Sequence, residues 1–436
     1  MPVTLDRTEK KGYNIDTTTT NPESEVTAMK PNPLPLPHYV CSLMDRLEAA
    51  GEEVYLVGGS LRDLLLGLVP HDYDLATSAR PEQTVAVFSD HRVIETGIKH
   101  GTVTILCEGN PVEITTFRID GAYTDARHPD AVTFTDRITD DLSRRDFTVN
   151  AMAYSPARGL IDPFDGQGDL RSRLLRAVGD PALRFTEDAL RIMRAFRFSA
   201  QLGFAIEEET LRAAANCRMG LDQIAKERIT SEFLRLICTD APAEALTQLD
   251  ACGIFPYLFG DYRPRPILWE LLSRMPRDEG ARLGLLLSDT DRTHASALLK
   301  ALKCSNKQIT AACAVLTNGK KSVTCPAEAR QFIASCGIYA SPAIQASILL
   351  GSSPAEALGW IENNQAPCTL GELAVSGRDL IAVGIEGRAV GKTLERLLQA
   401  VLEDPGRNQR EILLSLAQTK PNTHIFNTES TERKKR

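Results

Sequence analysis

The pattern of apolar and polar residues changes after residue 155. Between residues 38 and 155, short apolar runs rich in β-branched residues alternate with segments of helical periodicity. From about residue 165 onward, apolar residues recur almost wholly at helical spacing. This pattern predicts an α/β head followed by a helical body, so that the fold class of the whole chain is α+β.

Several short strands are expected in the head, bounded by Gly, Pro, Asn and Asp. They are the segments 53–59, 73–77, 91–96, 101–109, 111–119 and 131–134. We expect them to form a mixed sheet. Residues 37–51 and 81–88 have the spacing of helices, and a proline begins the second of them.

Residues 185–204 predict one continuous helix in the second part of the chain. Ala189, Met193, Phe196 and Ala200 would form its buried stripe, and Gly203 would end it. Two further helices are expected in the segments 207–217 and 226–238.

The composition is that of a globular protein and argues against several classes of protein. Of 436 residues, 43% are hydrophobic, and the formal net charge of −7 argues against indiscriminate nucleic-acid binding. No apolar run approaches ~20 residues and the N-terminus lacks the apolar core of a signal peptide, so we expect no membrane span. The ten cysteines form no Cys-x-x-Cys pair, which argues against a zinc site or a disulfide framework and fits a reducing cytoplasm.

The two ends of the chain differ from the rest. Residues 1–36 are rich in Thr, Pro, Asn and charged residues, and residues 420–436 end in TERKKR. Such composition predicts disordered extensions. Weak RNA contact is the alternative to a solvated basic tail.

Gly58 and Gly59 follow the first expected strand and precede a helical segment. Glycines at this place let the backbone turn sharply and present N–H groups to an anion, and the N-terminus of the following helix also favours phosphate. A purely structural turn between strand and helix is the alternative.

Asp72 and Asp74 flank Tyr73 at the start of the next expected strand, and in a strand residues i and i+2 project from the same face. Two carboxylates there repel each other, and a divalent cation such as Mg²⁺ would remove that cost. Glu113 would be a third acid if the strand 111–119 lies beside the one that bears the aspartates. The three acids beside a phosphate-binding turn predict phosphoryl transfer with two metal ions, and surface aspartates near a turn are the alternative.

Residues 140–154 hold a second group of polar residues. Arg144 and Arg145 offer forked donors suited to phosphate, and Asp146 and Asn150 can bond ribose hydroxyls. A helix end with a salt-bridged Arg–Asp pair is the alternative.

Asp188 and Arg191 would share one face of the expected helix 185–204. An intrahelical ion pair is the plain interpretation. However, cytosine and adenine both present an amine donor beside a ring-nitrogen acceptor, whereas uracil and guanine present the reverse order. A carboxylate and a guanidinium could therefore select C and A without a nucleic-acid template.

Arginine is concentrated between residues 170 and 200, where seven arginines accompany three acidic residues and leave a local charge of +4. Such a patch suits a triphosphate or an RNA backbone, and solvated helix faces are the alternative for part of it. Arg194 and Arg197 belong to this group and are candidate nucleotide-binding residues.

Seven segments resemble, in order and spacing, those of bacterial class II CCA-adding enzymes, which are tRNA nucleotidyltransferases of the DNA polymerase β superfamily. They lie within residues 38–240 and read GGSLRD, HDYDLAT, TGIKHGTVTI, VEITTFRIDGAYTDARHPD, RRDFTVNAMAY, DPFDGQGDL and EDALRIMRAFRFSAQLGF. Residues 373–405 resemble the C-terminal region of the same enzymes.

The resemblance implies addition of C, C and A to the 3′ end of tRNA from CTP and ATP, with Mg²⁺ bound by Asp72 and Asp74 and with Glu113 as a third acid. The residues that match the nucleotide-binding motifs of the family are Gly58, Gly59, Ser60, Arg62, Asp63, Arg144, Arg145, Asp146, Asn150, Asp188 and Arg191. Asp125 and Arg127 match a flexible loop of the family, and His71 stands where many relatives have Lys.

The resemblance also implies a curved molecule in four parts. These are a catalytic head at residues 37–155, a helical neck for nucleotide selection at 156–239, a helical body at 240–365 and a helical tail at 366–419. The tail would bind tRNA, and the enzyme would engage the 3′ end and acceptor arm.

Three alternatives share parts of this pattern. A bacterial poly(A) polymerase has the same head and neck, but no basic extension follows the neck here. An A-adding enzyme would also carry the loop YTDARHP, which CC-adding relatives tend to lack. A catalytically inactive RNA-binding relative is disfavoured by the intact acids, which are costly to keep together without a metal ion.

Overall fold

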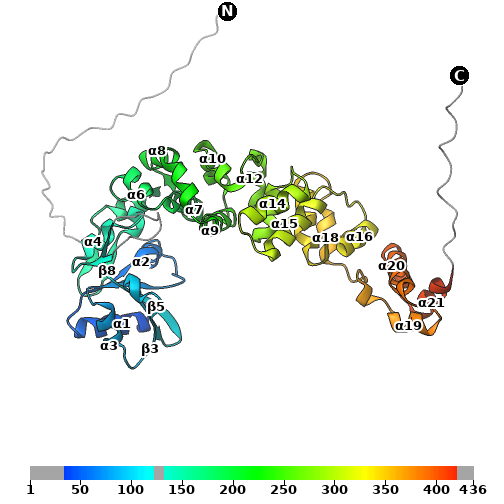
Figure 1. Cartoon of the computed structure of the whole chain (residues 1–436), viewed down its shortest axis with the longest axis horizontal. Helices are drawn as coiled ribbons and strands as arrows, with labels where there is room; N and C mark the ends of the chain where they lie inside the picture. The colour runs from blue at the N-terminus through cyan, green and yellow to red at the C-terminus, as the bar shows by residue number, and fades with distance from the viewer. Residues whose placement is uncertain (1–33, 122–131, 420–436) are drawn as a thin grey trace, which may run out of the picture.

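The computed structural model describes residues 34–121 and 132–419, which form an elongated arch (Figure 1). A strand-rich head lies at one end of the arch, and helices follow along it to the C-terminal helices at the other end. The fold class is α+β, as the sequence predicts.

The head is built on a seven-stranded sheet in the order β3-β4-β5-β2-β1-β8-β9. These strands are β1 (Val54–Val57), β2 (Asp74–Thr77), β3 (Arg92–Ile94), β4 (Thr102–Cys107), β5 (Asn110–Thr116), β8 (Ala153–Ser155) and β9 (Gly159–Ile161). Neighbouring strands are antiparallel except β2 and β5, which are parallel, so the sheet is mixed as predicted. Along β4, buried residues alternate with half-buried ones, which confirms the period of two.

Four helices accompany this sheet in the head: α1 (His38–Ala49), α2 (Gly58–Leu65), α3 (Pro81–Val87) and α4 (Ile138–Ser143). Helix α1 buries Val40, Leu43, Met44 and Leu47, which are spaced so that they share one face of the helix. Leu34 and Leu36 pack against the same core, although they fall within the segment 1–36 that we expected to be disordered. Residues 1–33 and 420–436 lie outside the described residues.

The expected strand 111–119 is interrupted at Phe117, whose N–H donates a hydrogen bond to the carbonyl of Thr77 at 2.8 Å. Beyond it, β6 (Arg118–Asp120) leaves the main sheet and pairs with β7 (Val132–Phe134) in a separate antiparallel pair. Strand β7 corresponds to the strand predicted at 131–134.

The expected helix 185–204 is two helices, α6 (Pro181–Glu187) and α7 (Leu190–Leu202). Between them Asp188 has extended backbone, with φ −142° and ψ 101°. Its Oδ1 accepts a hydrogen bond from the N–H of Leu190 at 3.0 Å, as the side chain of an N-cap residue does. The prediction of one continuous helix was therefore wrong at Asp188, because this aspartate begins a new helix instead of continuing the old one.

The predicted buried stripe is confirmed in its main part. Met193 and Phe196 are fully buried, Ala189 is nearly so, and Ala200 is half-buried. Gly203 ends α7 with a left-handed backbone, φ 66°, which glycine adopts without strain.

The remaining helices continue along the arch (Figure 1). They are α5 (Gly166–Ser172), α8 (Glu208–Cys217), α9 (Lys226–Ile237), α10 (Ala243–Ala251), α11 (Phe255–Phe259), α12 (Pro266–Leu272), α13 (Glu279–Leu286), α14 (Arg292–Ala301), α15 (Asn306–Asn318), α16 (Pro326–Cys336), α17 (Ala340–Leu349), α18 (Glu356–Glu362), α19 (Gly377–Ala382), α20 (Arg388–Glu403) and α21 (Arg410–Gln418). Helices α8 and α9 match the two predicted segments. The expected neck, 156–239, is not wholly helical. Strand β9 falls within it but belongs to the head sheet, and the short strands β10 (Leu174–Leu175) and β11 (Ala205–Ile206) form a parallel pair.

Arg282 joins α9 to the segment that follows α12. Its side chain is 1% exposed, and its guanidinium donates hydrogen bonds to the carbonyls of Ile237 and Thr239 at 2.6 and 2.7 Å and to that of Met275 at 2.9 Å. A planar group with several fixed donors is suited to hold two chain segments at one angle.

Among the described residues, Pro326–Leu349 is long and apolar enough to cross a membrane, with a mean hydropathy of 1.4. It consists of α16 and α17, joined at Gly337, where φ is 54°. Phe332 and Ile344 of these helices are buried in the main hydrophobic core. Packing within the protein therefore accounts for part of the apolar character of this stretch, whose most apolar window is 39% buried.

Candidate active site

A cleft of about 1280 Å³ extends from the head to the helices of the expected body. Gly58, Asp74 and other head residues line it, as do residues of α7 and α9. Lys307, Gln308 and Tyr339 line it from the body.

The cleft brings together most of the residues that the sequence pattern singled out. Those that line it are Gly58, Gly59, Arg62, Asp63, His71, Asp72, Asp74, Arg144, Arg145, Asp146, Asn150, Asp188, Arg191, Arg194 and Arg197. Ser60 does not, because it is 1% exposed and its hydroxyl donates to the carbonyl of Val57 at 2.8 Å, which holds the turn together. Asp125 and Arg127 lie outside the described residues.

Gly58 is the first residue of α2 and directly follows β1, so both glycines belong to the helix that they were expected to precede. Its φ is +70°, a conformation that favours glycine. A Cβ atom at this position would lie 3.2 Å from Nη1 of Arg145 and 3.9 Å from Oδ2 of Asp74. The Arg145 guanidinium therefore lies so close to the turn that a larger residue at Gly58 would displace it, whereas Asp74 is at an ordinary contact distance.

Asp74, the first residue of β2, lies directly opposite Glu113 in the parallel pairing of β2 with β5. This is the adjacency on which the prediction of a third acid depended. Asp72 lies in a bend before β2, so the expectation that both aspartates alternate within one strand was wrong. Glu113 is exposed and is not part of the cleft lining.

The acids affect one another electrostatically. Burial raises the pKa of Asp74, and the negative charges of Asp72 and Glu113 raise it further, to about 6, although the charge of Arg145 opposes them. The part of the rise that comes from Asp72 and Glu113 shows that negative charge gathers here beyond what Arg145 compensates. A cation bound at this place would supply the compensation.

The donor set suits a divalent metal ion that keeps other ligands. Within residues 34–121 and 132–419, no three His, Cys, Asp or Glu side chains are grouped so that they could hold a metal ion by themselves. Mg²⁺ does not need such a cage, because it binds through one or two carboxylates together with water and substrate phosphates. Asp72 and Asp74 therefore fit such an ion as partial ligands.

Arg144 and Arg145 both form ion pairs with Asp141, a fully buried residue of α4. Nη2 of Arg144 lies 2.7 Å from Oδ1, and Nη2 of Arg145 lies 3.0 Å from Oδ2. The Arg–Asp pair considered as an alternative is thus present, but its acid is Asp141 and not Asp146. Nε of Arg145 is buried without a hydrogen-bond partner among the described residues.

Asp146 is held by Arg194 and Asn150. Arg194 donates to Oδ2 from Nε at 2.8 Å and from Nη2 at 2.5 Å, and the Asn150 amide donates to Oδ1 at 3.1 Å. Burial raises the pKa of Asp146, but the charge and hydrogen bonds of Arg194 and the Asn150 amide outweigh it and lower the pKa to about 2. The side-chain carbonyl of Asn150 accepts a hydrogen bond from Nη1 of Arg62 at 2.8 Å. This network therefore connects α7 to α2.

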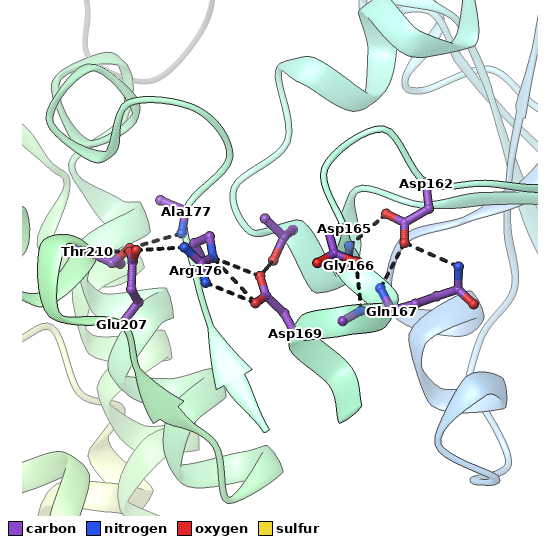
Figure 2. A network of polar contacts seen from close by, with 11 residues as sticks. Asp162, Asp165, Gly166, Gln167, Asp169, Arg176, Ala177, Glu207 and Thr210 are labelled. Carbon is purple, nitrogen blue, oxygen red and sulfur yellow. Dashed lines mark hydrogen bonds and ion pairs between the residues drawn. The ribbon is translucent and has the colours of Figure 1, made fainter. Parts of the chain in front are cut away.

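A second polar network holds the backbone that carries Asn150 (Figure 2). Asp169 accepts hydrogen bonds from the Thr148 hydroxyl at 2.7 Å and from Nε of Arg176 at 3.1 Å. Nη1 of Arg176 then donates to Glu207 at 2.9 Å. Thr148 begins a 3₁₀ turn, Thr148–Asn150, and the network fixes this turn against α5 and the segment before α8.

Asp188 and Arg191 both line the cleft, but each is held by another partner. Oδ2 of Asp188 accepts a hydrogen bond from Nη2 of Arg228 at 3.0 Å. Arg191 donates from Nη1 to Glu187 at 2.6 Å and from Nη2 to the carbonyl of Arg144 at 2.9 Å. Asp188 therefore reaches the cleft from just before α7, and Arg191 reaches it from the first turn of α7. The two side chains are not neighbours on one helix face.

The excess of arginine between residues 170 and 200 is balanced by acids, many of them from other segments. Five of the seven arginines form ion pairs: Arg176 with Asp169 and Glu207, Arg184 and Arg191 with Glu187, Arg194 with Asp146, and Arg197 with Glu232. The local charge of +4 is therefore not a free basic patch. Burial lowers the pKa of Arg197 in spite of the adjacent Glu232.

The cleft also contains residues that the sequence patterns did not mark, among them Phe198 and Arg228. The guanidinium carbons of Arg62, Arg194 and Arg197 lie 5.2, 5.1 and 3.8 Å from the centre of the Phe198 ring. Phe198 could have been found, because it follows Arg191 by two helical turns on the same face. No local signal marks Arg228, which comes from α9.

Comparison with known proteins gives the family. Residues 54–176 match a model of the poly A polymerase head domain, residues 203–268 one of the probable RNA and SrmB-binding site of polymerase A, and residues 280–417 one of tRNA nucleotidyltransferase domain 2. The CCA-adding enzyme of Limosilactobacillus fermentum is 39% identical over 383 residues, which cover 86% of this chain and 95% of that relative. The chain belongs to the CCA-adding enzyme family. The CCA-adding enzyme of Geobacillus kaustophilus is 37% identical over 400 residues, covering 88% of this chain and 97% of that relative.

Solved structures of CCA-adding enzymes have the same fold. The Bacillus stearothermophilus CCA-adding enzyme in complex with CTP has a TM-score of 0.73 at 32% identity and covers 87% of this chain and 96% of its own. The Thermotoga maritima CCA-adding enzyme complexed with tRNA has a TM-score of 0.61 at 22% identity, which supports the fold alone. CCA-adding enzymes are tRNA nucleotidyltransferases, and the family implies a divalent metal ion.

Proposed function

We propose that this CCA-adding enzyme completes the 3′ end of tRNA by adding C, C and A in turn from CTP and ATP, without a nucleic-acid template and with release of pyrophosphate. Membership of the family supports the reaction. The observation that carries the assignment to this cleft is the register of Asp74 opposite Glu113, because it gathers acids beside the Gly58 turn. Nucleotidyl transfer requires such a group of acids next to a phosphate-binding backbone.

The head residues bind the triphosphate in this proposal. The first N–H groups of α2, at Gly58 and Gly59, have no partners within the helix and favour an anion. Arg145, which approaches Gly58, offers a guanidinium to the same phosphates. Asp72 and Asp74 would hold Mg²⁺, which when bound activates the 3′ hydroxyl of the RNA and stabilises the leaving pyrophosphate.

Asp146 and Asn150 position the ribose in this proposal. The low pKa of Asp146 keeps its carboxylate ionised, so that it can accept hydrogen bonds from ribose hydroxyls. Because Arg194 and Arg62 hold these two residues, neither has to rearrange when the nucleotide binds.

Asp188 and Arg191 select the base. The Asp188 carboxylate accepts from the exocyclic amine of cytosine or adenine, and the Arg191 guanidinium donates to the neighbouring ring nitrogen. Uracil and guanine place a carbonyl opposite the carboxylate and an N–H opposite the guanidinium, so both contacts become repulsive. Hydrogen bonds and ion pairs hold both side chains in place: Asp188 caps α7 and pairs with Arg228, and Arg191 pairs with Glu187. This supports the role, because base selection requires groups with fixed positions.

The expected division of the chain follows from this assignment. Residues 37–155, together with β9 of the same sheet, form the catalytic head. The rest of 156–239 is the neck that contributes Asp188, residues 240–365 are the body, and residues 366–419 are a tail that binds tRNA. The enzyme acts in the cytoplasm, a location supported by its ten free cysteines.

A nucleotide-incorporation assay tests the proposal. The protein is incubated with tRNAs that end in the discriminator base, in C or in CC, together with each nucleotide and Mg²⁺. We expect addition of CCA, CA and A respectively, with termination after A. Two models named after poly(A) polymerase favour that enzyme as the second candidate, and repetitive adenylate tails would establish it instead. Addition of A only to the tRNA that ends in CC would indicate an A-adding enzyme.

A further inference from the structure

Arg228 belongs to the first turn of α9 and reaches the base-selecting carboxylate from outside the predicted motif. Its Nη2 donates to Oδ2 of Asp188 at 3.0 Å, and 25% of the Arg228 side chain and 16% of the Asp188 side chain are exposed. Both residues line the cleft. Asp188 cannot turn away from Arg228 without cost, because its other oxygen caps α7.

Within residues 34–121 and 132–419, nothing pairs with the other terminal nitrogen of Arg228. Nη1 is buried and makes no hydrogen bond within the described part of the chain. Buried donors are nearly always paired, so a buried donor beside a binding cleft calls for an acceptor from a ligand. Arg191 differs in this respect, because both of its terminal nitrogens donate to protein oxygens.

The chemistry of the bases identifies that acceptor. On the edge of adenine the exocyclic amine lies between two acceptors, the ring nitrogen N1 and the nitrogen N7. Cytosine presents its amine beside the ring nitrogen N3 on one side and a C5–H group, which accepts nothing, on the other. In the proposed complex Asp188 accepts from the adenine amine and Arg191 donates to N1. The position on the other side of the amine, next to N7, is then left for a third residue.

We propose that Arg228 is a third base-selecting residue and that its Nη1–H group donates to N7 of adenine. This inference rests on the proposed function of Asp188 and Arg191. It gives ATP one hydrogen bond that CTP cannot form, within a pocket whose other two contacts suit both bases equally. Arg228 therefore favours A at the last step without weakening the selection of C.

An analogue of ATP tests the proposal on the wild-type enzyme. In 7-deaza-ATP a C–H group replaces N7, and the amine and N1 remain. With tRNA ending in CC, we expect kcat/KM for 7-deaza-ATP to be about tenfold below that for ATP, the usual size of a charged hydrogen bond. Equal use of the two nucleotides would overturn the proposal.

The variant Arg228→Met supplies the second arm. We expect it to lower kcat/KM for ATP about tenfold more than kcat/KM for CTP, because loss of the contact with Asp188 affects both nucleotides but only ATP also loses the bond to N7. The difference between ATP and 7-deaza-ATP should disappear. Equal losses for C and A would show that Arg228 only holds Asp188, and would overturn its role in selecting A. A wild-type enzyme that adds neither C nor A would instead contradict the proposed function itself. If the Met variant does not fold, the wild-type comparison still decides.

Discussion

Asp74 on β2 lies in register with Glu113 on β5, across a parallel pair of strands at the centre of the head sheet. The pairing places two acids from distant parts of the chain side by side, and Asp72 adds a third negative charge. Like charges in such positions lower stability unless a cation compensates them. The proposed activity depends on this relationship, because the acids that lower the stability of the fold are those that would hold Mg²⁺.

Gly58 and Gly67 form a matched pair for a first prediction. Both have positive φ, +70° and +73°, but a Cβ at Gly58 would meet Arg145 and Asp74, whereas nothing lies within 4 Å of one at Gly67. Replacing either glycine by Ala should cost about 1 kcal/mol in urea unfolding, because of the backbone conformation. Only Gly58→Ala should also lower the rate of CTP incorporation, by about tenfold or more, because it displaces Arg145. Equal activity of the two variants would contradict the role of the turn.

The lowered pKa of Asp146 makes the free energy of unfolding decrease at acid pH. Its folded pKa, about 2, lies below the value of an unfolded aspartate, so its contribution is complete above the unfolded pKa, ~3.9, and is lost as pH falls through the folded value. The contribution is about 2 kcal/mol, and Asp146→Asn should lose that amount at pH 7. Urea unfolding at pH 7 and pH 3 measures it. The difference between wild type and variant should shrink at pH 3, and a constant difference would assign the loss to packing instead.

The network in Figure 2 predicts that removing Asp169 lowers the free energy of unfolding more than removing Arg176 does. Asp169 is 7% exposed in its side chain and Arg176 is 43% exposed. Asp169→Ala should cost about 2–3 kcal/mol of unfolding free energy, because it leaves the buried Thr148 hydroxyl without an acceptor. Arg176→Ala should cost about 1 kcal/mol or less, since water screens an exposed ion pair. Thermal or urea unfolding of both variants checks this order, and the reverse order would contradict it.

A divalent cation should stabilise the folded enzyme even without substrate. Millimolar Mg²⁺ should raise the melting temperature of wild type by a few degrees, because a ligand that binds only the folded state stabilises it. Asp74→Asn should show no such increase, and NaCl at the same ionic strength controls for screening. An equal increase in wild type and variant would place the ion elsewhere.

Much of the fold follows from periodicity. The alternation along residues 101–109 and the helical stripe from Ala189 to Phe196 predicted β4 and α7, because burial of one face imposes these periods. The break at Asp188 was missed because an aspartate within a helical pattern can continue a helix or cap a new one. The apolar stripe continues through it in either case, so only the hydrogen bond to Leu190 distinguishes the two.

The candidate site was predictable where its residues follow one another closely in sequence. Gly58, Asp72 and Asp74 lie within one short segment, and the cleft contains them all. Ion pairs across long separations were not predictable. Arg228 is 40 residues from Asp188, and its position depends on how α9 packs against α7, which no local pattern encodes.

The variant Asp74→Asn tests the central claim most directly, with CTP incorporation into a tRNA that lacks CCA and thermal unfolding measured on the same protein. The amide keeps the size of the side chain and removes its charge. We predict that incorporation falls about 10³-fold or more while the melting temperature is unchanged or higher, because the repulsion from Asp72 and Glu113 is relieved. Incorporation within about threefold of wild type would contradict the account, because transition-state stabilisation by these acids would then be negligible.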